Sequence, residues 1–244
     1  MKSSQFFIYK SVLFLGLFVG CASAPKVLFK DAVDTETKPI RYQDKRTFTF
    51  TDSGVSFSNQ FEGARLNAVD QLNDSVFIVT ILPENEPINH SPYYAFDVWS
   101  SSPKEITLKF KYPEQYKHRY VPKIKSNGVW SVADSLAFQF DENFSSLKLQ
   151  TNPIAKTVSG QELHTSSDVY SWVDQLIKGK GNYVRSKTIG KTRLKRPFKV
   201  LDIYKGTPEN KPVLVLLTRQ HPPEVTGYFA FQAFLSTILE ENKL

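Results

Sequence analysis

The segment Val213-Leu-Val-Leu-Leu-Thr-Arg-Gln-His-Pro-Pro-Glu-Val-Thr-Gly227 decides the fold of the C-terminal part of the chain. Its first five residues are apolar without alternation, which predicts a β-strand over Val213–Thr218 that is covered on both faces. Pro222 and Pro223 suit a loop that enters the first turn of a helix, where a missing N–H costs little. Ligands of open α/β sheets gather beyond the carboxyl ends of such strands.

A candidate metal-binding pair lies in this loop. His221 and Glu224 are three residues apart, so their side chains can close on one ion if the backbone turns between them. Imidazole nitrogen and carboxylate oxygen are zinc ligands, and a catalytic zinc takes three protein ligands and a water. The pair predicts two of those three ligands. Spacing alone leaves a surface loop with an incidental histidine as the alternative.

The elements around the loop predict the beginning of an α/β domain with a mixed sheet over residues 160–244. Apolar residues from Val169 to Ile177 follow a helical period, after a capping box at Thr165-Ser-Ser-Asp168. Strands are expected at 183–189 and 198–204. A second helix is expected over 225–240, with inward-facing Phe231, Phe234, Leu235, Ile238 and Leu239. These elements are too few to cover both faces of a sheet, so we expect a truncated chain or one that pairs with a second chain.

Residues 46–155 have a different period. Polar and apolar residues alternate in short runs such as Thr47–Thr51 and Ile106–Tyr112, with turn signals such as Ser126-Asn-Gly128 between runs. Short alternating strands at this spacing predict an antiparallel β-sandwich.

The N-terminus has the features of an export signal. Lys2 and Lys10 precede the apolar run Val12–Val19, which is too short to span a bilayer. Residues 1–21 are therefore predicted to be a signal peptide with a lipobox, in which Cys21 becomes lipidated, and polar residues 22–45 are predicted to form a tether. This predicts export to a bacterial cell envelope with a lipid anchor in the membrane. The alternative is a signal cut after Ala24, which would give a periplasmic or secreted protein.

The composition excludes some classes of site and partner. Cys21 is the only cysteine, so the chain can form no internal disulfide and no cysteine-based metal site. Loss of residues 1–20 lowers the net charge from +7 to +5, a mild excess that does not predict nucleic-acid binding. Much of the excess lies between Lys178 and Lys199, which predicts either a solvated hairpin or a rim that attracts anionic partners.

These residues resemble a known family. The loop block Arg219–Gly227, with the strand before it and the helix after it, resembles the opening of an M14-type zinc carboxypeptidase domain. The sandwich resembles the one that precedes the catalytic domain in the cytosolic carboxypeptidase subgroup. The resemblance covers roughly residues 46–240, and its other matching segments are Phe57–Asn67, Tyr94–Trp99, Ile106–Tyr112, Gly190–Thr192 and 198–204.

The resemblance implies a two-domain fold, an N-terminal antiparallel β-sandwich followed by the beginning of a zinc carboxypeptidase domain. It implies that His221 and Glu224 bind Zn²⁺, and that the substrate is a peptide or protein from which C-terminal residues are hydrolysed. The family's third zinc ligand, its substrate-binding Arg and Asn and its general-base Glu have no matching position here. No catalytic residue is therefore assigned, and this chain alone is expected to be inactive. Arg219 is expected to support the metal loop.

Other candidate sites have simpler explanations. His90, His118 and His164 are expected to face solvent, and His164, Ser166 and Asp168 are too close in sequence for a catalytic triad. The alternative function is a non-enzymatic surface lipoprotein whose sandwich binds peptide or glycan.

Overall fold

The structure is a computed structural model that describes residues 40–84, 93–114, 116–140, 145–192, 194–221 and 223–240. Cys21, His90, the predicted signal peptide and residues 22–39 of the predicted tether lie outside these ranges. The chain divides into units 1–38 and 39–244, and every described residue belongs to the second. In this part of the chain, no helix is long and apolar enough to cross a membrane.

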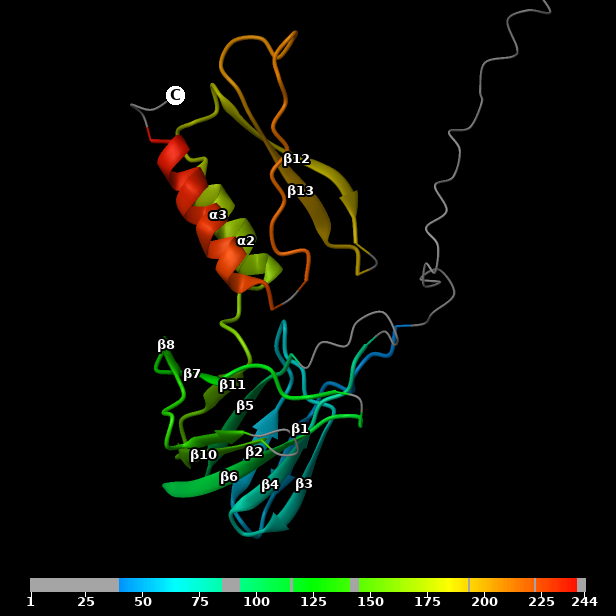
Figure 1. The fold of residues 1–244 in the computed structure, drawn as a ribbon, viewed down its shortest axis with the longest axis vertical. Coiled ribbons are helices and arrows are strands. Elements are labelled where there is room, and N and C mark those ends of the chain that lie inside the picture. Colours follow the sequence, from blue (N-terminus) through cyan, green and yellow to red (C-terminus); the bar gives the residue numbers. More distant parts are fainter. Residues whose placement is uncertain are drawn as a thin grey trace, which may run out of the picture. The chain divides into compact units, whose positions relative to one another are not determined.

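Residues 47–159 form two β-sheets (Figure 1). The six-stranded sheet has the order β1-β2-β5-β11-β7-β8, and the five-stranded sheet has the order β3-β4-β6-β10-β9. The strands are β1 Thr47–Phe50, β2 Val55–Ser58, β3 Ala68–Asn73, β4 Val76–Thr80, β5 Ala95–Ser100, β6 Lys104–Lys111, β7 Lys123–Ser126, β8 Val129–Val132, β9 Phe138–Phe140, β10 Ser145–Thr151 and β11 Lys156–Ser159.

One apolar core lies between the two sheets. In β6, Ile106, Leu108 and Phe110 are buried while the residues between them are more exposed, as the period-two pattern predicts. Phe57 of β2 and Phe77 of β4 meet across the core with ring centroids 5.3 Å apart. The predicted sandwich is thus present.

The sequence predicted a wholly antiparallel sandwich, and that prediction is wrong for one pair of strands. β4 pairs with β6 in parallel, with Val76 opposite Thr107. Between these two strands the chain crosses to the other sheet as β5 and then returns in the same direction. Alternation reports which face of a strand is buried but not its direction, so a long-range crossover of this kind leaves no signal in the sequence.

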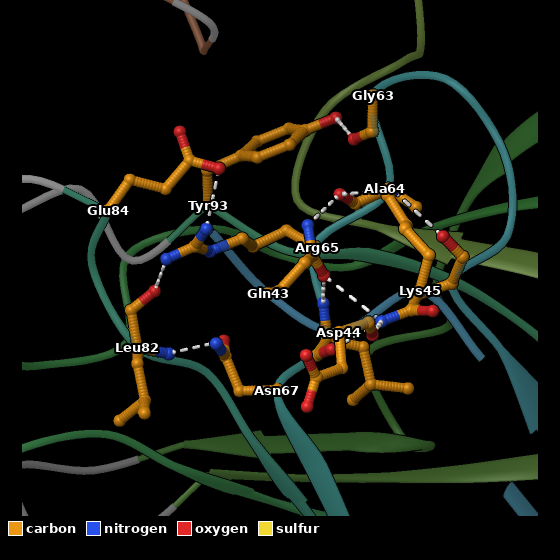
Figure 2. Close-up of polar contacts among 12 residues, drawn as sticks. Gln43, Asp44, Lys45, Gly63, Ala64, Arg65, Asn67, Leu82, Glu84 and Tyr93 are labelled. Atoms are coloured by element: carbon orange, nitrogen blue, oxygen red, sulfur yellow. Dashed lines mark hydrogen bonds and ion pairs between the residues drawn. The ribbon is translucent and has the colours of Figure 1, made fainter. Parts of the chain in front are cut away.

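Residues 41–45, which fall in the predicted tether, are bound to the sandwich (Figure 2). Gln43 donates from Nε2 to the Ala64 carbonyl at 2.6 Å and accepts at Oε1 from Leu66 N–H at 2.8 Å. Lys45 Nζ donates to the carbonyl of Asn59 at 2.8 Å. These contacts fix the path by which the chain enters β1.

A buried arginine closes the same end of the sandwich (Figure 2). Arg65 is buried, forms an ion pair with Glu84 at 2.7 Å and donates to the Leu82 carbonyl. Burial is the main cause that lowers the pKa of Arg65, and the nearby Glu84 carboxylate opposes that shift. Arg65 therefore has a structural role within the segment that carries the sandwich resemblance.

The C-terminal segment contains helices α2 Ser166–Leu176 and α3 Val225–Ile238, and strands β12 Val184–Lys191 and β13 Pro197–Ile203. The predicted capping box is present, because Asp168 N–H donates to Thr165 Oγ1 at 3.2 Å and Thr165 N–H donates to Asp168 Oδ2 at 2.8 Å. β12 and β13 form a two-stranded antiparallel sheet. The mixed sheet that the sequence predicted is absent from the described residues of this segment.

The predicted strand over Val213–Thr218 is wrong. Val213–Leu217 lies outside every strand, and its side chains are exposed, 85% for Val213 and 72% for Leu217. Within the part of the chain that the structure describes, these five residues make no backbone hydrogen bond. A strand forms only when neighbouring strands pair with it, and here β12 and β13 pair with each other alone.

The inward face of α3 is also narrower than predicted. Leu235 and Leu239 are buried as expected, together with Val225 and Tyr228, but Phe234 is 44% exposed. Apolar residues on several sides of a helix indicate a helix that is covered on several sides. This helix and Val213–Leu217 thus present uncovered apolar surface within the same segment.

Candidate metal site

A sharp change of backbone direction forms the loop that carries the predicted metal ligands. Arg219 has a φ of 50°, in the left-handed region that a residue with a side chain seldom adopts. Two residues later a tight turn follows, in which Glu224 N–H donates to the His221 carbonyl at 3.2 Å. α3 begins at Val225, directly after this turn. Strain of this kind persists where the surrounding structure holds it, and it gathers at functional sites.

The turn brings His221 and Glu224 together. His221 Nδ1 lies 2.8 Å from Glu224 Oε1, and His221 N–H donates to Glu224 Oε2 at 3.1 Å. Both side chains are accessible, with 66% and 49% of their surfaces exposed. Hydrogen bonds from the imidazole and from the backbone N–H of His221 lower the pKa of the Glu224 carboxyl, which favours its charged form.

The two side chains lie close to each other, and their nitrogen and oxygen are ligand types that zinc accepts. In this structure the two atoms are hydrogen-bonded to each other, so shared binding of an ion would replace that hydrogen bond. The backbone N–H bond to Oε2 orients the carboxylate, as outer contacts of metal ligands do. No group of three His, Cys, Asp or Glu side chains that could hold a metal occurs among the described residues. The roles of His221 and Glu224 as ligands remain a prediction.

Arg219 links the loop to neighbouring elements. Its guanidinium donates to the carbonyl of His164 and lies 5.9 Å from the ring centroid of Tyr228 in α3. Burial is the largest cause that lowers the pKa of Arg219. These contacts agree with the predicted role of Arg219 in supporting the loop. Tyr228 was not among the predicted site residues, although its position three residues after Val225 marks it as part of the inward face of the helix.

An open hollow of about 410 Å³ adjoins the loop. It is lined by Glu224 and Arg219, by Leu217 at the end of the exposed apolar run, and by Phe231 of α3. One candidate ligand therefore faces a space that a peptide side chain could enter.

His118 and His164 were predicted to face solvent, and the structure shows that this prediction is wrong. His118 is buried among aromatic rings, with Tyr112 Oη 2.9 Å from Nδ1 and the Tyr120 carbonyl 2.6 Å from Nε2. His164 is partly buried against Tyr228 and Phe229, and its Nε2 is buried without a hydrogen-bond partner among the described residues. Burial lowers the pKa of both histidines. Charged neighbours in the sequence gave no sign of these packed environments.

Comparison with known proteins identifies the segment that contains this loop. Residues 169–243 match the family model of zinc carboxypeptidase, peptidase family M14. The C-terminal segment belongs to the zinc carboxypeptidase family. His221 and Glu224 both lie within this zinc carboxypeptidase segment. No curated protein matches the chain.

Solved structures share the fold. A metallo-carboxypeptidase from Burkholderia cenocepacia has a TM-score of 0.62 and 13% identity, over 76% of this chain and 49% of its own. A Pseudomonas aeruginosa metallo-carboxypeptidase, solved with (2-guanidinoethylmercapto)succinic acid, has a TM-score of 0.62 and 14% identity, over 76% of this chain and 50% of its own. The shared fold reaches beyond the zinc carboxypeptidase segment into the sandwich. The chain spans about half the length of these two structures.

Proposed function

We propose that this chain supplies two ligands, His221 and Glu224, of the zinc site of a metallocarboxypeptidase that removes C-terminal residues from peptides or proteins. The observation that carries the proposal is the proximity of His221 Nδ1 and Glu224 Oε1, 2.8 Å apart, in a segment that matches the zinc carboxypeptidase family. Zinc bound there would polarise a peptide carbonyl and acidify a bound water.

The residues around the pair have separate roles in the proposal. The left-handed turn at Arg219 and its hydrogen bond to the His164 carbonyl hold the loop, and the start of α3 fixes Glu224. The hollow beside Glu224 would receive the substrate. We propose that the third protein ligand and the general base come from polypeptide outside the described residues.

The uncovered apolar surface supports this view of an incomplete site. Val213–Leu217 leads directly into the metal loop, and its exposed side chains and unpaired backbone have the character of an interior strand without its neighbours. Further strands packed on this segment would also stiffen the loop that follows it. Export to the cell envelope and lipidation of Cys21 are part of the same proposal, and they rest on the sequence of residues 1–21.

Zinc titration of the purified chain tests the proposal. We expect weak binding, because two protein ligands leave the remaining zinc positions to water. His221→Ala should abolish it, and Glu224→Gln should lower the affinity by roughly tenfold or more, because a neutral amide is a poorer ligand than a carboxylate for a divalent ion. Calorimetry or competition with a metal indicator gives the affinities.

His90→Gln is the matched control, because it removes a histidine that lies far from the metal loop in the sequence. This variant should keep the affinity of the unchanged chain. If His221→Ala binds zinc as the unchanged chain does, the assignment of the ligand pair is wrong. Circular dichroism spectra of each variant should overlay, since His221 and Glu224 are exposed.

A further inference from the structure

The positive charge of the chain is concentrated in one hairpin. Residues 178–205 contain ten Lys and Arg residues and one acidic residue, Asp202. The rest of the chain contains 21 basic and 23 acidic residues, so the hairpin accounts for the whole positive balance. Concentrated charge of this kind sets up a local field that attracts anionic partners.

Ion pairs neutralise part of this charge, mostly along the strands. Lys187 pairs with Asp202, Lys199 lies 3.8 Å from Asp174, and Arg196 lies 2.8 Å from Glu62. Lys191 and Lys195, at the turn that joins β12 and β13, have no acidic partner among the described residues. Two uncompensated lysines, Lys191 and Lys195, therefore lie at the tip of the hairpin.

The same tip exposes large apolar side chains. Ile189 is 61% exposed, Leu194 65% and Phe198 54%. Ile189 lies at the irregularity in the β12–β13 ladder, next to Gly190, which pairs with Phe198. Leu194 lies in the turn itself. Lysines and apolar side chains thus alternate over the end of one hairpin.

Backbone hydrogen bonds link the described residues on both sides of this tip. Thr192 N–H donates to the Arg196 carbonyl at 2.9 Å, and Lys195 N–H donates to the Thr192 carbonyl at 2.8 Å. Lys195 has a φ of 60°, which tightens the turn between these bonds. The backbone that carries Leu194 and Lys195 is therefore already turned, which lowers the cost of ordering it when a surface binds.

We propose that this tip, formed by Ile189, Lys191, Leu194, Lys195 and Phe198, docks onto an anionic phospholipid bilayer. Apolar side chains enter the boundary between head groups and acyl chains, while lysines above them contact anionic head groups. Leucine and phenylalanine are among the apolar side chains by which peripheral segments enter that boundary. An acidic polypeptide that lacks apolar residues would satisfy the lysines but leave three apolar side chains in water. The predicted export signal, with its apolar run Val12–Val19, independently predicts that the chain meets a membrane.

The experiment measures whether the tip itself reaches the lipid, so that membrane contact through the N-terminus cannot imitate it. The full chain with Cys21→Ser and Thr188→Cys carries a fluorophore on its single thiol, beside Ile189. It is mixed with vesicles of phosphatidylcholine alone, or of phosphatidylcholine and phosphatidylglycerol in equal parts. We expect the anionic vesicles to shield the fluorophore from acrylamide quenching, and the neutral vesicles to leave it accessible.

Further variants identify the groups responsible. Lys191→Gln with Lys195→Gln should raise the lipid concentration needed for shielding by about 30-fold, the factor that about 1 kcal/mol for each lysine gives. Leu194→Ser with Phe198→Ser should raise it by roughly tenfold or more, through lost apolar burial. The matched control, Lys111→Gln with Lys148→Gln on exposed sandwich positions, should change nothing.

Three results would overturn the proposal. One is a fluorophore at residue 188 that stays quenchable on anionic vesicles. Another is equal shielding of a fluorophore at Ser135→Cys, in an exposed turn of the sandwich. The third is shielding by soluble polyglutamate at matched charge when anionic vesicles give none, which would assign the tip to acidic polypeptides.

Discussion

At the scale of single residues, a buried amide holds the entry to the sandwich. Asn59 is fully buried and accepts at Oδ1 from Arg46 N–H at 2.7 Å. Its Nδ2 donates to the carbonyls of Asp44 at 2.7 Å and Leu66 at 2.8 Å. One side chain therefore joins the segment before β1 to the loop after β2.

Asn59→Ala should lower the free energy of unfolding by about 3 kcal/mol, because it leaves several buried backbone groups without partners. Urea denaturation followed by circular dichroism gives this value. Gln150→Ala, at an exposed position in β10, should stay within about 0.5 kcal/mol of the unchanged chain. A loss at Asn59 no larger than at Gln150 would contradict the role of the amide.

His118 should make the stability of the sandwich depend on pH. The Tyr120 carbonyl can only accept, so Nε2 carries the proton and Nδ1 accepts from the Tyr112 hydroxyl. Burial holds the pKa of His118 below its ordinary value. The unfolded chain then binds more protons than the folded one as pH falls through about 6.5, the ordinary histidine pKa, so stability is lost below that pH and is complete above it.

The His118→Gln variant should therefore have a lower free energy of unfolding at pH 7. That free energy should also change less between pH 7 and 5 than it does in the unchanged chain. Chemical denaturation at several pH values measures both effects. His164→Gln is the comparison, because burial also lowers the pKa of His164 and it should remove a separate part of the slope. An unchanged slope in His118→Gln would show that this histidine is not a source of the pH dependence.

At the scale of elements, the exposed apolar run should make the chain associate. Val213 and Val215 are 85% and 71% exposed in an extended segment, and such segments pair with other chains. Val213→Thr with Val215→Thr keeps the shape of each side chain and removes apolar surface, so it should lower self-association measured by light scattering. The control is Leu136→Thr with Ile154→Thr, which removes exposed apolar surface from turns of the sandwich outside any strand. Equal association of all three proteins would contradict this expectation.

The elements that the sequence predicts well are those whose signal is local. The strands of the sandwich alternate because each has one buried face, and α2 begins at a capping box of adjacent residues. The parallel pairing of β4 with β6 and the burial of His118 depend on residues far away in the chain. Val213–Leu217 has the composition of an interior strand, but composition cannot supply the strands that would pair with it. The pair His221 and Glu224 could be predicted as candidate ligands because the two residue types lie three residues apart, and their role in metal binding stays a prediction.

At the scale of the whole molecule, the proposed zinc site needs two kinds of contribution. His221 and Glu224 belong to the described residues, and the third ligand and the general base are proposed to lie outside them. The chain spans about half the length of the solved carboxypeptidases that share its fold. Its C-terminal segment provides two candidate ligands, and no three-ligand group occurs in the described part of the chain. Zinc binding and peptide hydrolysis are therefore expected to separate in this chain.

The purified chain, supplied with zinc, should release no C-terminal residues from a mixture of peptides analysed by mass spectrometry. Two ligands do not fix a zinc-bound water against a substrate, and the general base that takes its proton has no assigned position here. The His221→Ala variant is the control, because any release that both proteins share comes from a contaminating peptidase. Steady release by the unchanged chain that His221→Ala abolishes would contradict the prediction. The missing ligand would then have to come from this chain itself or from a second copy of it. Dilution would distinguish the two, because the specific activity of a dimer falls as the protein is diluted and that of a single chain does not.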